Sequence, residues 1–179
     1  MQYTTSHASP LGTLTVAGTG ESITGLWMDG QKYYAATIKG RIEEKHDLPV
    51  FAKAREWLDA YFAGEKPAIS QLPLTPVGSD FRKAIWDILR EIPYGQYTTY
   101  GAIAKLAASR MNRKSMSSQA VGGAVGHNPI SIIIPCHRVV GSNGSLTGFA
   151  GGIDKKIKLL ELEGADLSKF FVPKKGTAL

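Results

Sequence analysis

The run Ile132–Val140 constrains the fold of this chain more than any other stretch, because it joins apolar residues, a proline and the only cysteine. Three isoleucines that end at a proline are typical of a short, fully buried strand. Pro135 donates no backbone hydrogen bond and fixes its own φ, so we expect the strand to end there and the chain to turn. Such a turn can hold the Cys136 thiol rigidly at the floor of a pocket. Alternatively, Cys136 is a small buried apolar residue, and the run alone leaves both interpretations open.

Composition limits the class of protein. A chain of 179 residues, 43% hydrophobic and 20% charged, is long enough for a substantial core and is typical of soluble globular proteins. No apolar run approaches the roughly 20 residues of a membrane-spanning helix, and Met1–Thr5 lacks the pattern of a signal peptide. One cysteine can form neither an internal disulfide nor a cysteine-cluster zinc site. We therefore expect a cytoplasmic protein without membrane contact, in a reducing compartment that keeps Cys136 a free thiol.

The net charge of +6 is confined to one part of the chain. Residues 1–76 carry seven basic and eight acidic side chains, a net charge of −1, so the remaining residues carry +7. A positive field restricted to the part that contains the cysteine suits a polyanionic partner. Ordinary solubilising charge is the alternative explanation of the same count.

Residues 1–76 have the pattern of a small α+β domain. Strands are predicted over residues 11–17 and 23–28. A helix is predicted over residues 50–62, where apolar side chains recur at i, i+3 and i+4 spacing. We find no chemistry in this domain and predict that it supports the next one by packing. Three prolines within residues 67–76 predict an extended linker.

Residues 77–179 are predicted to form a second, mostly helical domain. The predicted helices cover residues 79–92, 99–108, 118–126 and 153–163, with Ser79 as the cap of the first and Thr98 or Thr99 as the cap of the second. The tail after Asp166 is expected to be frayed. The second and third helices, joined by the polar and basic loop of residues 109–118, are compatible with a helix-turn-helix, with Ile103 and Leu106 facing inward. Gly122, Gly123 and Gly126 each weaken the third helix by roughly 1 kcal/mol relative to alanine. That cost indicates close approach of the backbone, either to a neighbouring element or to DNA.

A resemblance to a known family adds to these patterns. Pro135-Cys136-His137-Arg138-Val139 resembles the active-site signature of the O6-alkylguanine-DNA alkyltransferases, the methylated-DNA–protein-cysteine methyltransferases. Ile92-Pro93-Tyr94-Gly95, Ala120-Val121-Gly122-Gly123-Ala124 and the region around Gly151-Gly152 resemble the family in the same order, so that the likeness covers residues 77–165. It implies an α+β (α/β) fold: a ribonuclease H-like sheet domain over residues 1–76, then a helix-turn-helix DNA-binding domain over residues 77–179. It implies neither a metal nor a cofactor.

The chemistry of a thiol fits this resemblance. A cysteine attacks as its thiolate, so Cys136 needs a group that takes its proton. Neighbouring side chains in an extended chain diverge, so we expect a water molecule to bridge Cys136 and His137. The resemblance implies Glu163 as the carboxylate that orients His137. A glutamate at the C-terminal end of a helix is electrostatically misplaced, which favours a specific partner over the alternative of a solvated charge.

The reaction implied by the resemblance is displacement at the alkyl carbon of O6-alkylguanine, and also of O4-alkylthymine, in double-stranded DNA. A thioether has no good leaving group, so each molecule acts once. The damaged base lies within the stack and must be flipped out to reach Cys136. Tyr100 is implied as the proton donor to the leaving base, and Asn128 as a brace between the recognition helix and the active-site strand. The implied substrate pocket consists of Val139, Phe149, Ala150, Gly151 and Lys156.

The same resemblance places the second helix of the helix-turn-helix in the minor groove, with Ser118, Ala120 and Gly122 facing the DNA, and we expect a monomer. Gln119 stands where the family usually carries an arginine that fills the space left by the flipped base. Glutamine can wedge and hydrogen-bond there, but it lacks the charge and the stacking plane. We expect phosphate contacts from nearby cations to offset part of this loss. The cations assigned to DNA are Arg110, Arg113, Lys114 and Arg138.

Three other functions are compatible with parts of the pattern. A non-catalytic DNA-lesion-binding or regulatory protein of the same fold would need no nucleophile, and the presence of Cys136 argues against it. A cysteine hydrolase would use Cys136 with a histidine, but the chain lacks an oxyanion-loop signature. A thiol redox protein would need a second, resolving cysteine.

Overall fold

The structure, a computed structural model, describes residues 1–174. Within this part of the chain the backbone forms two compact units. The first consists of residues 1–78 together with residues 129–133, and the second of residues 79–128 together with the chain from Ile134 onward. Nothing in the sequence pattern predicts that residues 129–133 belong with the first unit, and they lead directly to the cysteine.

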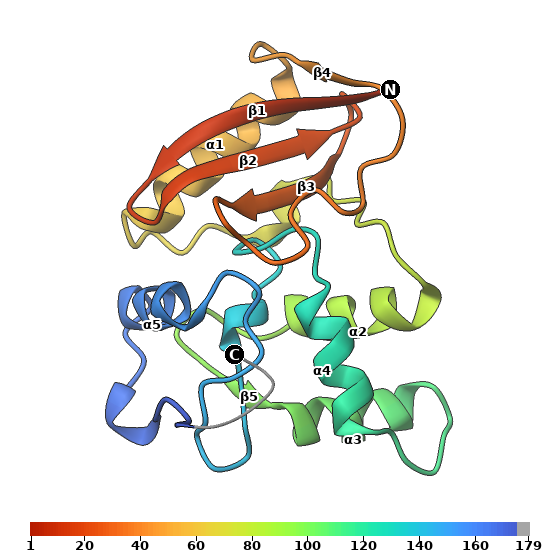
Figure 1. The fold of residues 1–179 in the computed structure, drawn as a ribbon, viewed down its shortest axis with the longest axis vertical. Helices are drawn as coiled ribbons and strands as arrows, with labels where there is room; N and C mark the ends of the chain where they lie inside the picture. Colours follow the sequence, from red (N-terminus) through yellow and green to blue (C-terminus); the bar gives the residue numbers. More distant parts are fainter. Residues whose placement is uncertain (175–179) are drawn as a thin grey trace. The chain divides into compact units, whose positions relative to one another are not determined.

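In the described chain, the first unit is built on a four-stranded sheet (Figure 1). The strands are β1 (Gln2–Ser9), β2 (Gly12–Gly18), β3 (Ile23–Met28) and β4 (Ile42–Glu44), in the spatial order β3-β2-β1-β4. β1, β2 and β3 are antiparallel neighbours, whereas β4 runs parallel to β1. The two predicted strands are confirmed as β2 and β3. The prediction missed β1 because its sequence, QYTTSHAS, is polar and does not alternate with apolar residues.

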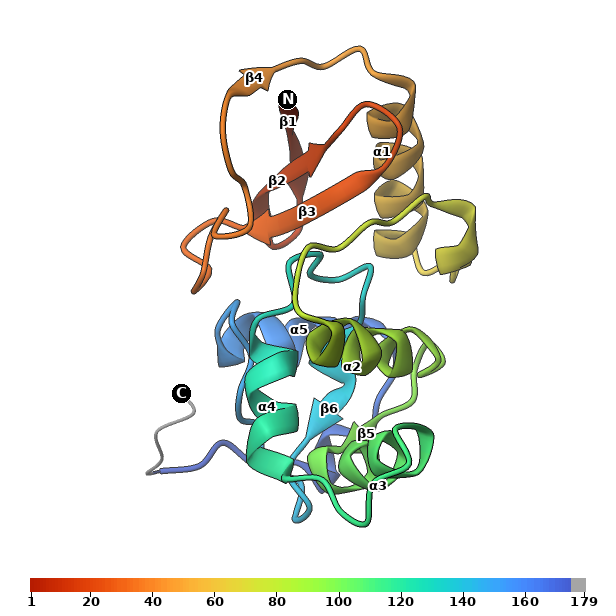
Figure 2. The same cartoon turned by 90° about the vertical axis from the view of Figure 1, so that its right-hand side faces the viewer.

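The helix α1 (Pro49–Phe62) packs against this sheet (Figure 2) and confirms the predicted helix. Phe51 and Leu58 on α1 are fully buried, as is Leu14 on β2, because the i, i+3, i+4 spacing gathers the apolar side chains on one face. The proline-rich segment that follows is not extended throughout, since it contains the 3₁₀ turn η1 (Ile69–Gln71).

Residues 129–133 lie along the β3 edge of the sheet. The backbone N–H of Leu26 donates to the Pro129 carbonyl at 2.8 Å, and that of Ser131 donates to the Leu26 carbonyl at 3.0 Å. The Ser131 hydroxyl donates to the side-chain oxygen of the buried Gln31 at 3.1 Å. The segment that leads to the cysteine is therefore fixed to the first unit by backbone and side-chain hydrogen bonds.

The isoleucine run is buried, as predicted, but the prediction of a strand is wrong, because residues 132–134 form a turn. Ile132 has a φ of +70°, and Ile133 N donates to the Ser131 carbonyl at 2.8 Å. Left-handed backbone at a β-branched residue costs about 1–3 kcal/mol and persists only where the surroundings enforce it. Here the burial of the isoleucines and the hydrogen bonds of Ser131 do so. Apolar composition predicts burial, but it does not distinguish a strand from a buried turn.

The helices of the second unit are α2 (Asp80–Arg90), α3 (Tyr100–Arg110), α4 (Ser118–Gly126) and α5 (Ile153–Leu162). The first three begin at side-chain caps: Ser79, Thr99 and Ser117 each accept a hydrogen bond from the backbone N–H three residues later. Ser79 is the predicted cap, and Thr99 is one of the two residues predicted for its helix. α3, the connector of residues 111–117 and α4 form the predicted helix-turn-helix. No helix in the described part of the chain is long and apolar enough to cross a membrane.

Apolar side chains join the three helices α2, α3 and α4. Trp86 on α2 is buried and donates from its indole nitrogen to the Ala124 carbonyl on α4 at 2.8 Å. Ile103 on α3 is buried as predicted, whereas the prediction for Leu106 is wrong, since this side chain is 39% exposed. Ile103 and Ala107 define the buried face of α3, and residue 106 falls on another side of the helix.

A short parallel pairing links the two halves of the candidate site. β5 (Thr98–Thr99) pairs with β6 (Val139–Val140). β5 leads directly into α3, and β6 follows the 3₁₀ turn η2 (Cys136–Arg138) (Figure 2). The pairing thus brings Tyr100, the first residue of α3, close to the chain that carries the cysteine. After α5 the chain forms a further 3₁₀ turn, η3 (Leu167–Lys169).

Candidate active site

Cys136 is the first residue of η2 and is only 4% exposed. Burial raises the pKa of its thiol, while a hydrogen bond with the Asn128 side chain and the charge of Lys156 act in the opposite direction. Because the net shift is upward, Cys136 is a thiol at neutral pH and needs a base to become nucleophilic.

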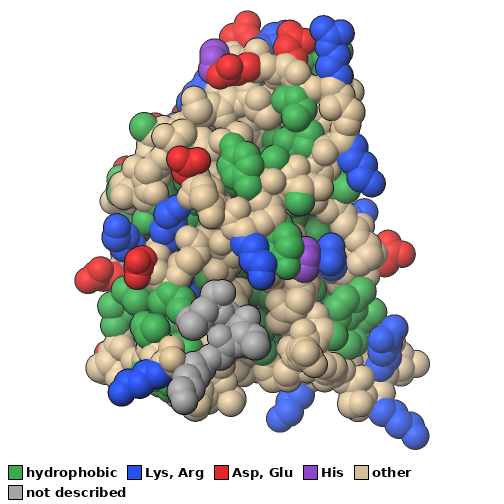
Figure 3. All heavy atoms as spheres, in the orientation of Figure 1, with side chains coloured by type: hydrophobic (Ala, Val, Ile, Leu, Met, Phe, Trp, Pro, Cys, Tyr) green, Lys and Arg blue, Asp and Glu red, His purple; other side chains and the backbone are tan. Residues whose placement is uncertain are grey.

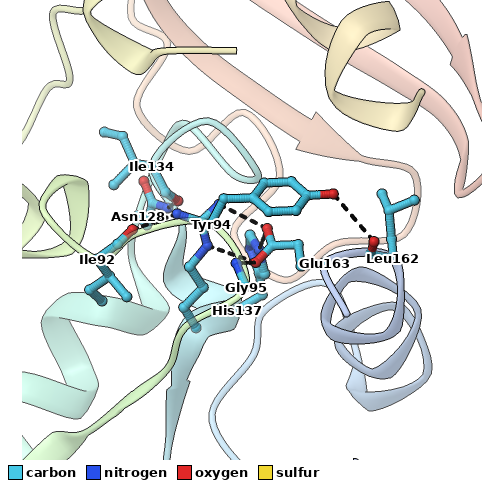
Figure 4. A network of polar contacts seen from close by, with 9 residues as sticks. Ile92, Tyr94, Gly95, Asn128, Ile134, His137, Leu162 and Glu163 are labelled. Carbon is cyan, nitrogen blue, oxygen red and sulfur yellow. Dashed lines mark hydrogen bonds and ion pairs between the residues drawn. The ribbon is translucent and has the colours of Figure 1, made fainter. Parts of the chain in front are cut away.

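Asn128 follows α4 and ties the end of that helix to the chain entering the cysteine turn. Its side-chain nitrogen donates to the Ile134 carbonyl at 2.7 Å, and the residue is buried (Figure 4). The resemblance assigned Asn128 the role of a brace, and this hydrogen bond is the contact through which it can act.

His137 and Glu163 form a buried pair (Figure 4). His137 Nε2 lies 2.7 Å from Glu163 Oε1, and neither side chain is exposed. An ionised carboxylate only accepts hydrogen bonds, so Nε2 carries the hydrogen and Nδ1 is the nitrogen that can take a proton. Burial lowers the pKa of His137 more than its hydrogen bond with Glu163 raises it. The ring is therefore neutral at neutral pH, which is the state a general base requires.

Glu163 is the C-cap residue of α5 and accepts hydrogen bonds from several elements. Arg138 donates from Nε to Oε2 and from Nη2 to Oε1, both at 2.8 Å, and Gly95 N donates to Oε2 at 3.3 Å. Burial by itself would raise the pKa of this carboxyl, but the hydrogen bonds from His137 and Arg138 outweigh it and hold the pKa well below its usual range. These donors stabilise a carboxylate at the helix end where the dipole disfavours it.

Arg138, which the sequence assigned to DNA, is buried in the structure. The side chain is 5% exposed, its Nη1 donates to the Ile92 carbonyl at 2.6 Å, and its guanidinium carbon lies 5.7 Å from the centroid of the Tyr94 ring. All its described donors are thus directed into the protein. An arginine beside a reactive cysteine has the same sequence signature whether it points outward or inward, so the sequence could not separate the two.

Tyr100 and Lys156 both donate to the Thr147 carbonyl, which the sequence analysis did not single out. The Tyr100 hydroxyl lies 2.8 Å and Lys156 Nζ 2.9 Å from this oxygen, and Nζ also donates to the Val139 carbonyl at 2.5 Å. Burial raises the pKa of Tyr100, to which the charge of Cys136 adds, and burial lowers the pKa of Lys156 to about 8. Thr147 lies in a polar loop and acts through its backbone, so no side-chain motif could have revealed it.

A pocket of about 570 Å³ lies between the start of α3, α4 and the loop of residues 141–152. Its volume falls in the range of small-molecule sites, about 300–1,000 Å³. Four predicted site residues line this pocket: Tyr100, Ser118, Gln119 and Gly122. The other lining residues, which were not predicted, are Gly101, Gly123, Ser142, Thr147 and Gly148.

Two of the predicted pocket residues after the cysteine turn, Val139 and Phe149, contact Lys156 and His137. Phe149 is buried, and its ring meets the His137 ring edge-to-face with 6.5 Å between centroids. Val139 is buried and contributes its carbonyl to Lys156, whereas Ala150 and Gly151 are half-buried.

The predicted DNA-facing residues differ in their surroundings. Ala120 is exposed on α4, and Arg113 and Lys114 are exposed in the connector. Figure 3 shows Lys and Arg side chains along the edge where Figure 1 places α3 and this connector. Arg110 is already engaged, since its two terminal nitrogens donate to the Glu91 carboxylate at 2.7 and 2.8 Å. Its charge is therefore partly neutralised.

Fold and site together define a class of protein: one in which a buried cysteine precedes an imidazole–carboxylate pair and a helix-turn-helix forms one side of a pocket. Cys136 itself is not among the residues that line this pocket. Comparison with known families is more specific. Residues 1–76 match the ribonuclease-like domain of 6-O-methylguanine DNA methyltransferase, and residues 80–165 match the DNA binding domain of the same family. The chain therefore belongs to the 6-O-methylguanine DNA methyltransferase family.

Individual relatives are similar over nearly the whole chain. The methylated-DNA–protein-cysteine methyltransferase of Haemophilus influenzae is 46% identical over 161 residues, which are 90% of this chain and 86% of the relative. That of Methanosarcina acetivorans is 42% identical over 171 residues, 91% of this chain and 99% of the relative. The crystal structure of Mycobacterium tuberculosis OGT in complex with DNA is 40% identical, has a TM-score of 0.76 and covers 94% of each chain.

Proposed function

We propose that this protein repairs DNA directly, by transferring the alkyl group of O6-alkylguanine, and of O4-alkylthymine, to Sγ of Cys136 in one irreversible event. The family, and relatives named methylated-DNA–protein-cysteine methyltransferases, support DNA repair by alkyl transfer. The assignment to this cysteine depends on one observation. His137, the residue after Cys136, forms a buried pair with Glu163.

The proton of the thiol is taken by His137. Because Nε2 is committed to Glu163, the proton arrives at Nδ1, through a water molecule that bridges Cys136 and the ring. Glu163 stabilises the imidazolium that forms, as the carboxylate does in hydrolase triads. Asn128 and Lys156 favour the thiolate, since both lower the pKa of Cys136.

The transfer breaks the bond between O6 and the alkyl carbon and forms a bond between that carbon and Sγ. The electron pair stays on the base, which is protonated on a ring nitrogen as it leaves. Tyr100 is the proton donor, because the residue lines the pocket and the charge of Cys136 acts on its hydroxyl. The thiol proton is then on His137 and Tyr100 has lost one, so the protons balance once the imidazolium proton has returned to Tyr100 through solvent. The thioether that remains has no good leaving group, so each molecule acts once.

The helix-turn-helix presents the pocket to DNA. We assign Ser118, Ala120 and Gly122 on α4 to the minor groove, with Gln119 entering the stack where the flipped base has left. Their small side chains allow the close approach that this groove demands. Arg113 and Lys114 contact phosphates, while Arg110 contributes less because Glu91 neutralises it. The protein acts as a monomer in the cytoplasm, where Cys136 stays reduced.

The direct test is the mass of the intact protein after incubation with a duplex that carries one O6-methylguanine. We expect a mass gain of a single methyl group, and no gain in Cys136→Ser. A protein that binds the damaged duplex without gaining mass would instead be a lesion-binding or regulatory protein of the same fold.

A further inference from the structure

The loop of residues 141–152 forms one wall of the pocket and is attached to the chain on both of its sides. Ser142, Thr147 and Gly148 contribute to the wall. On one side, the Thr147 carbonyl accepts hydrogen bonds from Tyr100 and Lys156, as described above. The position of this carbonyl therefore sets how far the loop stands from Tyr100.

On its other side the loop is paired with residues 167–172, which we call the C-terminal strap. Leu146 N donates to the Phe171 carbonyl at 2.9 Å, and Phe171 N donates to the Gly144 carbonyl at 3.1 Å, as in a short parallel bridge. Leu146, paired here, immediately precedes Thr147. These two hydrogen bonds therefore couple the position of the pocket wall to that of the strap.

The strap is itself anchored by packing. Phe170 lies edge-to-face on Tyr97, with ring centroids 4.8 Å apart, and packs against a buried cluster of Val140, Leu146 and Leu160. Gly144 has a φ of +87°, and a Cβ at this position would clash with the Lys169 carbonyl. Loop and strap are therefore in close backbone contact, which only glycine permits at residue 144.

We propose that the C-terminal strap determines specificity: by fixing the loop of residues 141–152 it limits the size of the alkyl group that the pocket admits. The inference rests on the proposed function. The match to the family's DNA binding domain ends at residue 165, so the strap lies beyond it. A methyl group needs little room beside the base, whereas a benzyl group needs the wall to yield. Loosening the strap should therefore favour the larger group.

The test compares single-turnover rates on two duplexes of one sequence, carrying O6-methylguanine or O6-benzylguanine. Gly144→Ala pushes the strap away, and Phe170→Ala removes its anchor. Gly40→Ala is the matched control for backbone strain, because Gly40 has a φ of +84° and no described atom within 4 Å of its Cβ position. Phe171→Ala is the control for the second variant, because this side chain is 46% exposed and only its backbone bonds the loop.

We expect the benzyl-to-methyl rate ratio to rise at least about threefold in Gly144→Ala and Phe170→Ala, a factor that corresponds to the loss of one aromatic contact. In Gly40→Ala and Phe171→Ala the ratio should stay at the wild-type value. The ratio cancels any general loss of active protein, and two independent variants guard against misfolding of one. An unchanged ratio in both strap variants, or an equal rise in the controls, overturns the inference and leaves the proposed function intact. If the wild-type protein accepts an alkyl group from neither duplex, the proposed function itself is contradicted.

Discussion

At the scale of single residues, the site depends on how one buried carboxylate is shared. Glu163 accepts from His137 on one oxygen and from Arg138 on both. The guanidinium neutralises the carboxylate and fixes its plane, which leaves Oε1 directed at the imidazole. Without this partner, the buried negative charge would attract the imidazolium more strongly and raise the pKa of His137. Arg138 thus acts through Glu163: it keeps His137 neutral and correctly oriented.

Replacing Arg138 by methionine tests this role. We expect a loss of about 3–5 kcal/mol in the free energy of unfolding, because Glu163 stays buried without its guanidinium. The transfer rate at neutral pH should fall more than about tenfold, since a tenfold change needs only 1.4 kcal/mol. Urea unfolding and single-turnover kinetics measure the two effects.

Arg138→Lys is the control for this variant, because it keeps the charge but loses the paired donors. Its transfer rate should lie between those of wild type and Arg138→Met. DNA affinity should keep its salt dependence in both variants. A drop of about one in the slope of log affinity against log salt would instead mean that Arg138 contacts a phosphate, as its sequence context suggested.

At the scale of elements, α4 carries glycines that weaken it as a helix. A Cβ at Gly123 would meet no described atom within 4 Å, so the protein alone does not require glycine there. Gly123 is exposed, lies on the pocket wall and follows Gln119 by one helical turn. The proposed approach of DNA to this helix would account for the absence of a side chain at this residue.

Gly123→Ala should stabilise the protein by up to about 1 kcal/mol through helix propensity, and yet weaken DNA binding severalfold. Thermal unfolding and fluorescence anisotropy with a duplex measure the two changes. Gly126→Ala, at the end of the same helix and outside the pocket wall, should leave DNA affinity unchanged. Equal affinity of wild type and Gly123→Ala would show that α4 does not approach the groove closely at this residue.

At the scale of the whole molecule, the buried pair makes stability depend on pH in a definite direction. The pKa of His137 is lowered from its ordinary value of 6.5 and that of Glu163 from its ordinary value of 4.5. In both cases the unfolded state binds protons at a higher pH than the folded state does, so both groups make stability rise with pH. Their contribution is full above pH 6.5 and is lost as the pH falls, first through His137 and then through Glu163.

The free energy of unfolding, measured with urea between pH 8 and pH 4, should therefore decrease steadily below about pH 6.5. In His137→Asn the free energy of unfolding should decrease less between about pH 6.5 and 5, because the imidazole that titrates in this range is absent. Stability that increases as wild type is acidified over this range would contradict the buried, neutral imidazole.

Local signals in the sequence predicted local structure well. Short polar side chains at Ser79, Thr99 and Ser117 cap helices in the structure because each cap needs only a neighbouring backbone N–H. β1 and the turn of residues 132–134 depend on partners far away in sequence, so the pattern missed the first and misread the second. Pairing energy and burial, not local preference, decide such elements.

The same division holds for the site. Family motifs pointed to Cys136, His137 and Glu163, and the structure brings the last two within hydrogen-bond distance. The orientation of Arg138 and the carbonyl of Thr147 were beyond the sequence, because one depends on the direction of a side chain and the other on backbone geometry. The expectation of a frayed tail after Asp166 is wrong for the strap, because its backbone pairing leaves no side-chain signature.

The central claim is that Cys136 itself receives the alkyl group. A duplex whose O6-methylguanine carries a deuterated methyl group tests it most directly, with the protein digested after the reaction and its peptides mapped by tandem mass spectrometry. The account predicts one labelled methyl per protein molecule, on the peptide fragment containing Cys136, and an unmodified guanine in the duplex. Label found on another residue, or released as methanol while the protein turns over repeatedly, would contradict it.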